Sequence, residues 1–203
     1  MIAYHGDKKV KSKYVRRVRA HAKADQLVQG YGYWEDGKGC AVGCTIHGSE
    51  HSAYETELGI PRAIARIEDR LFECLPTKRA RRWPSQFLAA IPVGADLSMV
   101  VPRFLVFILT DCRPHAEGKV LESVDAVIAA YNRMIGGETI SREEWQRIRA
   151  AAYAAAAYAA DAAAAAAART KARESAYIRF ADELLRLLAD APIFAAKGGE
   201  DGE

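Results

Sequence analysis

The sequence has few cysteines, no long apolar segment and no signal-peptide pattern in its first residues, and we expect each scarcity to exclude a class of protein. The longest apolar run worth testing, residues 99–110, is too short for a membrane span and contains Pro102 and Arg103. The N-terminus lacks the apolar core and the small-residue cleavage site of a signal peptide. We therefore expect a cytoplasmic protein whose 4 cysteines are free thiols.

The remaining composition is that of a globular chain. Half of the 203 residues are hydrophobic, 27% are charged, and the net charge is only +3. This length allows one domain with a substantial core, which we place at residues 1–196. The Gly- and acid-rich residues 197–203 are expected to be a disordered tail.

Almost every segment has the apolar spacing of a helix, so we predict an all-α, single-domain bundle of about seven or eight helices. The expected helices cover residues 8–28, 39–48, 61–75, 84–91, 99–111, 118–135 and 141–190. Residues 99–111 are rich in Val, Phe and Ile, and a buried strand is the alternative there. We favour a helix because Asp96 or Ser98 can cap it and because no partner strand is evident.

The last third of the chain is rich in alanine, the residue with the highest helix propensity. From Ser141 to Asp190 there is no glycine or proline. One continuous helix over residues 141–190 would be roughly 70 Å long at 1.5 Å per residue. We prefer an Ala-rich helical hairpin that turns near Thr170, because the apolar stripe of the second half needs a packing partner.

Residues 37–51 concentrate the groups that can carry chemistry. Steps of four, three and four residues would place Cys40, Cys44, His47 and His51 along one side of a continuous helix. A thiol at a helix N-terminus beside Lys38 favours the thiolate. One hypothesis is therefore a hydrolase or transferase in which Cys40 is the nucleophile and His47 or His51 the base.

Two other interpretations of this segment remain open. Cys44, His47 and His51 could bind a metal with a further ligand from elsewhere in the fold, although four groups spread over about 16 Å of helix cannot all reach one ion. Alternatively, the two cysteines are small buried apolar residues, and the glycines permit close packing. We favour this last interpretation and expect no metal and no cofactor.

Two sequence patterns resemble known families. Residues 39–44 followed by residues 57–61 resemble the cysteine segment of papain-like and bacteriocin-processing peptidases, which implies catalysis by Cys40. Residues 33–44, with the GKGCAVGC motif, residues 94–98 and residues 180–185 after an Ala/Tyr-rich helix are together similar to a family of uncharacterised bacterial and phage proteins. The helical C-terminal third is also similar in composition to Ala-rich immunity proteins.

Basic residues gather near the N-terminus, where residues 1–35 contain eight Lys or Arg against three Asp or Glu. Such a surface attracts phosphates or acidic protein surfaces. Our leading hypothesis is a non-catalytic, helical interaction protein of phage or prophage type that binds a host or partner macromolecule through this face. A protein partner is favoured, and nucleic acid remains an alternative. The predicted binding residues are Lys13, Arg16, Arg17, Arg19, Trp34, Lys38, Arg79 and Arg82.

Overall fold

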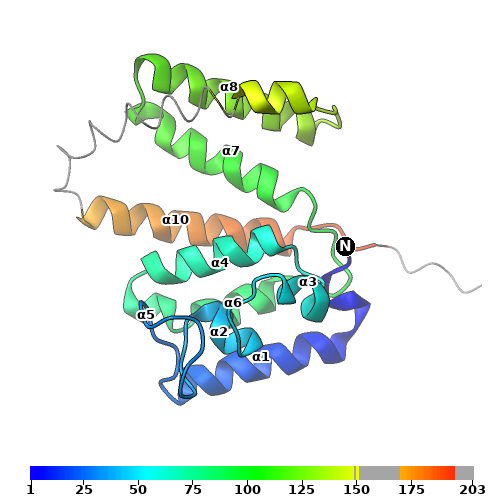
Figure 1. Cartoon of the computed structure of the whole chain (residues 1–203), viewed down its shortest axis with the longest axis vertical. Coiled ribbons are helices and arrows are strands. Elements are labelled where there is room, and N and C mark those ends of the chain that lie inside the picture. Colours follow the sequence, from blue (N-terminus) through cyan, green and yellow to red (C-terminus); the bar gives the residue numbers. More distant parts are fainter. Residues whose placement is uncertain (149, 151–169, 195–203) are drawn as a thin grey trace, which may run out of the picture. The chain divides into compact units, whose positions relative to one another are not determined.

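The computed structural model describes residues 1–148, 150 and 170–194, and every regular element in them is a helix (Figure 1). The β-type contacts found in this part of the chain are isolated bridges. The predicted all-α class is therefore confirmed. None of the described helices has the length and apolar character needed to cross a bilayer.

The described residues divide into two compact units. Unit 1 comprises residues 1–98 with the described part of residues 188–203, and unit 2 comprises the described part of residues 99–187. The single domain predicted for residues 1–196 stays a prediction.

Unit 1 contains a short 3-10 helix followed by six α-helices. These elements are η1 (Ala3–Gly6), α1 (Lys8–Lys23), α2 (Ala41–Ile46), α3 (Ala53–Leu58), α4 (Arg62–Cys74), α5 (Thr77–Ala80) and α6 (Trp83–Ala90). The side chain of Asp7 caps α1 by accepting a 2.6 Å hydrogen bond from the Lys9 amide. The helix ends at Lys23 rather than at residue 28, and Asp25, with a φ of 55°, turns the chain away.

The core of unit 1 is built from the inward faces of α1, α4 and α6. Helical spacing places Tyr14 and Val18 on one face of α1, and both are buried. Large hydrophobic residues of α4 and α6 with at most 3% exposure are Ile64, Leu71, Phe72, Trp83, Phe87 and Leu88. Hydrogen bonds from Ala3 to Ala95 and from Asp96 to Pro192 tie three distant segments of the unit together.

Two glycines let the loop before α2 lie directly on that helix. A Cβ atom on Gly39 or on Gly43 would overlap the carbonyl oxygen of Tyr33. The Gly39 amide also donates a hydrogen bond to Gln26, and its carbonyl accepts one from Val28. The expectation that glycines permit close packing in this segment is confirmed at these two positions.

Unit 2 contains α7 (Val100–Cys112), the 3-10 helix η2 (Arg113–His115), α8 (Gly118–Ile135) and α10 (Thr170–Ala189), the last of which belongs to this unit as far as Leu187. Residues 99–111 are helical as predicted, so the strand alternative is wrong. Pro102 lies in the first turn of α7, where its missing amide leaves no hydrogen bond unmade.

The ends of the elements in unit 2 are fixed by local contacts. Arg113 forms a bidentate pair with Asp125, and the Ser141 hydroxyl accepts a 3.1 Å hydrogen bond from the Glu144 amide at the start of helical residues 142–148. The alanine run that would form the first arm and turn of the predicted hairpin, and the predicted tail at 197–203, lie outside the described residues.

Candidate functional site

Cys40 is the N-cap of α2, and its sulfur accepts a 3.5 Å hydrogen bond from the Gly43 amide. Its side chain is buried, with 3% exposure. The helix ends at Ile46, because His47 adopts a left-handed conformation with a φ of 56°. The helix is shorter than the predicted 39–48, and Cys40, Cys44, His47 and His51 do not share one continuous helix.

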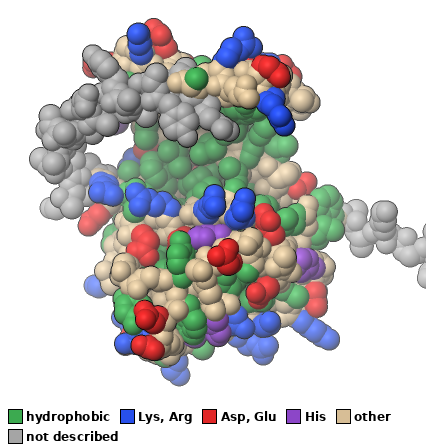
Figure 2. All heavy atoms as spheres, in the orientation of Figure 1, with side chains coloured by type: hydrophobic (Ala, Val, Ile, Leu, Met, Phe, Trp, Pro, Cys, Tyr) green, Lys and Arg blue, Asp and Glu red, His purple; other side chains and the backbone are tan. Residues whose placement is uncertain are grey.

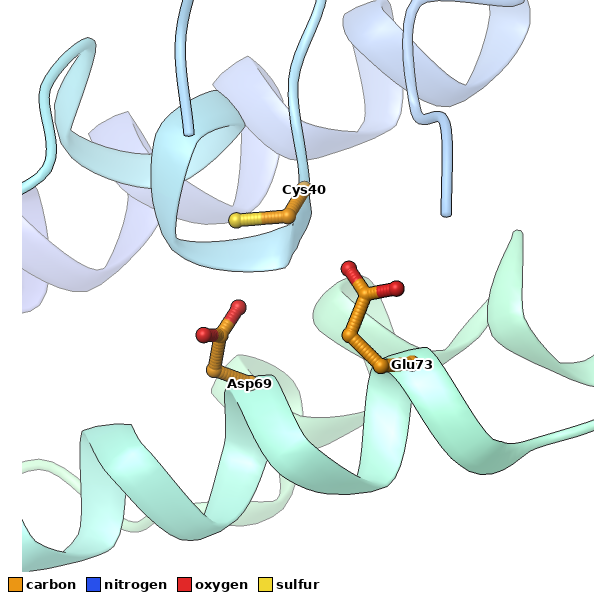
Figure 3. A group of neighbouring side chains, drawn as sticks. All are labelled: Cys40, Asp69 and Glu73. Carbon is orange, nitrogen blue, oxygen red and sulfur yellow. The ribbon is translucent and has the colours of Figure 1, made fainter. Parts of the chain in front are cut away.

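Two carboxylates of α4 face the Cys40 sulfur (Figure 3). One ligand atom from each of Cys40, Asp69 and Glu73 lies within 4.8 Å of the other two. Burial raises the pKa of the Cys40 thiol, the Gly43 amide acts in the opposite direction, and the neighbouring Asp69 raises it further. The thiol is therefore held protonated, which is the opposite of what a nucleophile requires.

His51 contacts one carboxylate of this cluster. Its Nε2 lies 3.4 Å from Oδ2 of Asp69, and its ring packs edge-on against Tyr33 with centroids 5.4 Å apart. The order is therefore thiol, carboxylate, imidazole, whereas an activated cysteine needs the imidazole beside the sulfur. Among the described residues, no hydrogen bond joins Cys40 to a histidine.

His47 belongs to a separate aromatic cluster on the surface of unit 1. Its Nε2 lies 2.9 Å from Nε2 of His21, and its ring stacks on Trp34 with centroids 4.2 Å apart. Nδ1 of His21 is 2.6 Å from the side-chain oxygen of Gln26. Burial lowers the pKa of His47, and Arg17 and His21 lower it further.

The metal ligands considered from the sequence are not brought together. The Cys44 thiol donates to the carbonyl groups of Gln26 and Gly39 at 3.5 Å, while His47 pairs with His21 and His51 contacts Asp69. Cys44, His47 and His51 thus contact three different sets of neighbours, and a common ion between them is not supported.

Sequence reasoning missed Asp69 and Glu73, although the sequence contains a signal for them. They are like charges four residues apart, which destabilise an isolated helix. Both lie on the side of α4 that also holds buried residues and both are only half-exposed. Two carboxylates that repel each other at the edge of a core indicate a candidate ligand site.

A groove with a basic lining runs along α1 and has a volume of about 580 Å³. It is lined by Lys8, Lys9, Lys11, Ser12, Val15, Arg16, Arg19 and Ala89. No acidic side chain is among these residues, and α1 itself contains none. Figure 2 shows Lys and Arg side chains gathered along the edge where Figure 1 places α1.

Lys11 fixes one wall of this groove. Its ammonium group donates to the carbonyl oxygens of Ala89 and Ile91 at 2.7 and 2.6 Å, which joins α1 to the end of α6. Partial burial lowers the pKa of Lys11. The remaining cations of the groove, Lys8, Lys9, Arg16 and Arg19, are exposed.

Two of the eight predicted binding residues line the groove. Arg16 and Arg19 line the groove, whereas Arg17 donates a 2.7 Å hydrogen bond to the Thr45 carbonyl and packs over the Tyr14 ring. The others lie outside the groove: Lys13, Lys38 and Arg82 are exposed, and Trp34 and Arg79 are half-buried. Arg81, which lies between Arg79 and Arg82 in the sequence, pairs with Asp25, so its charge is partly neutralised within the chain.

Comparison of the chain with protein-family models, with characterised proteins and with solved structures gave no match. The two family resemblances and the likeness to immunity proteins stay predictions from the sequence. The function must therefore be argued from the residues of this chain.

Proposed function

We propose that the protein is a non-catalytic, helical interaction protein that binds an acidic protein surface through the groove along α1. The supporting observation is that five cations, Lys8, Lys9, Lys11, Arg16 and Arg19, line one concave surface, and that no acidic residue is part of its lining. The phage or prophage setting is part of this proposal and rests on the sequence resemblance alone.

The spacing of the basic side chains along α1 supports an extended partner. Lys8, Ser12, Arg16 and Arg19 follow one another at intervals of four, four and three residues, so they project from one face of the helix. At 1.5 Å per residue this row is roughly 16 Å long. Carboxylates on a helix or strand of a partner can meet such a row one after another.

An acidic protein is favoured over nucleic acid because the groove has no ring on which a base could stack. Tyr14 on α1 is buried, and its hydroxyl donates to Glu57. Trp34 is stacked on His47. The lining of the groove offers charge, one hydroxyl and small apolar groups, which suit carboxylates better than bases.

The geometry of Cys40 gives less support to the enzyme alternative. Its thiol is buried, it faces carboxylates, and within the described residues it lacks an adjacent imidazole. The cysteine-dependent hydrolase or transferase is therefore not the function that we propose.

A charge-reversal pair tests the proposal. Arg16→Glu with Arg19→Glu should weaken binding of the full chain to poly-L-glutamate by at least about tenfold at low salt. Lys119→Glu with Arg142→Glu changes the net charge equally on exposed residues outside the groove and should leave binding within about twofold. Fluorescence anisotropy at several salt concentrations measures both pairs.

The same assay contains the outcomes that contradict the proposal. Equal weakening by the two pairs would mean that net charge, and not the groove, attracts the probe. Tighter binding to a single-stranded DNA oligonucleotide of matched charge would replace the acidic protein by nucleic acid. Absence of binding to either probe at low salt would leave the groove without the proposed role.

A further inference from the structure

We propose that Cys40, Asp69 and Glu73 form a binding site for one zinc ion. This inference is independent of the groove along α1 and of any partner bound there. The three side chains come from two elements: Cys40 caps α2, and the two carboxylates lie one turn apart on α4. Figure 3 shows both carboxylates directed from α4 toward Cys40.

The second oxygen of each carboxylate is already held in place. Oδ2 of Asp69 lies 3.4 Å from Nε2 of His51, and Oε2 of Glu73 accepts a 2.7 Å hydrogen bond from the Gly30 amide. Zinc ligands in proteins are commonly oriented in this way by an outer layer of hydrogen bonds. The arrangement leaves one oxygen of each carboxylate to face the cluster.

One carboxylate oxygen of the cluster is buried and has no hydrogen-bond donor. Oδ1 of Asp69 is inaccessible to solvent and accepts no hydrogen bond from any described residue. Leaving a buried carboxylate oxygen unsatisfied costs on the order of 1–3 kcal/mol. Cys40 is buried as well. A cation bound by the cluster would satisfy this oxygen.

The charge balance also favours a cation. Neither Asp69 nor Glu73 forms an ion pair with Lys or Arg in the described residues. The two carboxylates lie one turn apart on α4 and close to each other, so their negative charges repel. A bound divalent ion would attract all three groups and so offset the repulsion among them.

The donor set selects the class of metal. A thiolate excludes Ca²⁺ and Mg²⁺, which prefer oxygen ligands alone, and favours a borderline ion such as Zn²⁺. Tetrahedral zinc with bonds of about 2.0–2.3 Å separates its ligand atoms by about 3.5 Å. Because the present separations are within 4.8 Å, the three side chains need to close by only on the order of 1 Å.

Three protein ligands leave the fourth position of a tetrahedral ion open, as in zinc sites that hold water or an exogenous ligand. Binding replaces the proton on the Cys40 sulfur by a zinc–sulfur bond, and the proton passes to solvent. No electron is transferred, and no further reactant is needed. His51 is a positioning residue in this scheme, because it acts on the ion through Asp69.

The test uses the tag-free full chain, treated with a chelator and then titrated with Zn²⁺ against a chromophoric competitor. We expect one ion per chain and at least about tenfold weaker binding for Asp69→Asn and for Glu73→Gln. Glu122→Gln, an exposed carboxylate on α8, is the matched control and should bind as tightly as the unaltered chain.

Co²⁺ supplies a second readout that depends on the sulfur. A thiolate-to-cobalt charge-transfer band should appear in the unaltered chain and in Cys112→Ser, and should be absent in Cys40→Ser. His51→Gln should retain the band while weakening affinity by about tenfold. Circular dichroism shows whether each variant is folded. If Cys40→Ser unfolds, the zinc affinity of Glu73→Gln tests the site instead, because Glu73 is half-exposed and its substitution should not disturb the core.

The proposal fails if the chain takes up less than one equivalent of Zn²⁺ at micromolar concentrations. It also fails if the cobalt band survives in Cys40→Ser, or if Glu122→Gln weakens binding as much as Glu73→Gln. Each of these results would show that the cluster is a packing arrangement of three polar groups.

Discussion

The Tyr54 hydroxyl donates a 2.7 Å hydrogen bond to Oε2 of Glu68, and both side chains are completely buried. The indole of Trp83 donates to the main-chain oxygen of the same glutamate at 3.0 Å. Oε1 of Glu68 accepts no hydrogen bond from the described residues. Burial raises the pKa of Glu68 to about 8, against a smaller opposing effect of the Tyr54 hydrogen bond, so the carboxyl is mostly protonated at neutral pH.

This relationship predicts how stability depends on pH. A carboxyl whose pKa is higher in the folded chain favours folding at low pH, and that contribution is lost as pH rises from 4.5 through about 8. Glu68→Gln keeps an acceptor for Tyr54 but cannot ionise. Between pH 4.5 and about 8, the free energy of unfolding of the unaltered chain should therefore fall relative to that of Glu68→Gln. Urea unfolding at a series of pH values measures this difference. Parallel pH profiles for the two proteins would contradict the prediction.

The close approach of the Tyr33 loop to α2 predicts a steep penalty at Gly43. A Cβ atom at this position would overlap the Tyr33 carbonyl oxygen, which is main chain and cannot rotate away. Gly43→Ala should destabilise unit 1 by about 2 kcal/mol or more. Gly48→Ala has nothing within 4 Å of its new Cβ and should change stability by less than about 0.5 kcal/mol. Equal denaturation midpoints for the two variants would show that the loop can move aside.

The four thiols should react with a neutral-pH alkylating reagent in an order set by exposure. Cys112 is exposed, Cys74 is half-exposed, and Cys40 and Cys44 are buried with raised pKa values. We expect Cys112 to be labelled first and Cys40 and Cys44 only when the chain unfolds. Mass spectrometry of digested protein reads the order. Rapid labelling of Cys40 in the folded chain would restore the enzyme hypothesis.

The His21–His47 pair predicts a loss of stability in mild acid. Burial, Arg17 and His21 lower the pKa of His47, so the unfolded chain binds its proton more readily. The stabilisation is complete above the ordinary pKa of 6.5 and is lost as pH falls below it. His47→Asn, which tolerates the left-handed backbone, should lose less stability over that range. Thermal unfolding at a series of pH values checks this, with the exposed His115→Gln as control; identical slopes for His47→Asn and the unaltered chain would contradict it.

Much of the fold followed from local patterns. The spacing of Ile64, Leu71 and other apolar residues predicted α4, and Pro102 in a first turn was compatible with α7. The end of α1 was misplaced because nothing in the sequence of residues 24–28 announces the left-handed Asp25. The compartment, the partner and the phage setting stay predictions.

The candidate site was only half visible in the sequence. Cys40 and His51 were singled out, as a possible nucleophile and its possible base. The actual neighbours of Cys40 are Asp69 and Glu73, which lie about thirty positions away along the chain. A helical pattern cannot indicate which distant helix face a thiol meets. Within residues 37–51, the left-handed His47 ends α2 and so separates Cys40 and Cys44 from His51.

The sequence by itself determined that this is a helical protein with a basic first helix, because helix formation and charge depend on residues a few positions apart. Only the tertiary structure decided that the Cys40 thiol faces carboxylates and not imidazoles, and that α1 forms one wall of a cationic groove. Those contacts join segments far apart in the chain, and the packing of whole helices selects them.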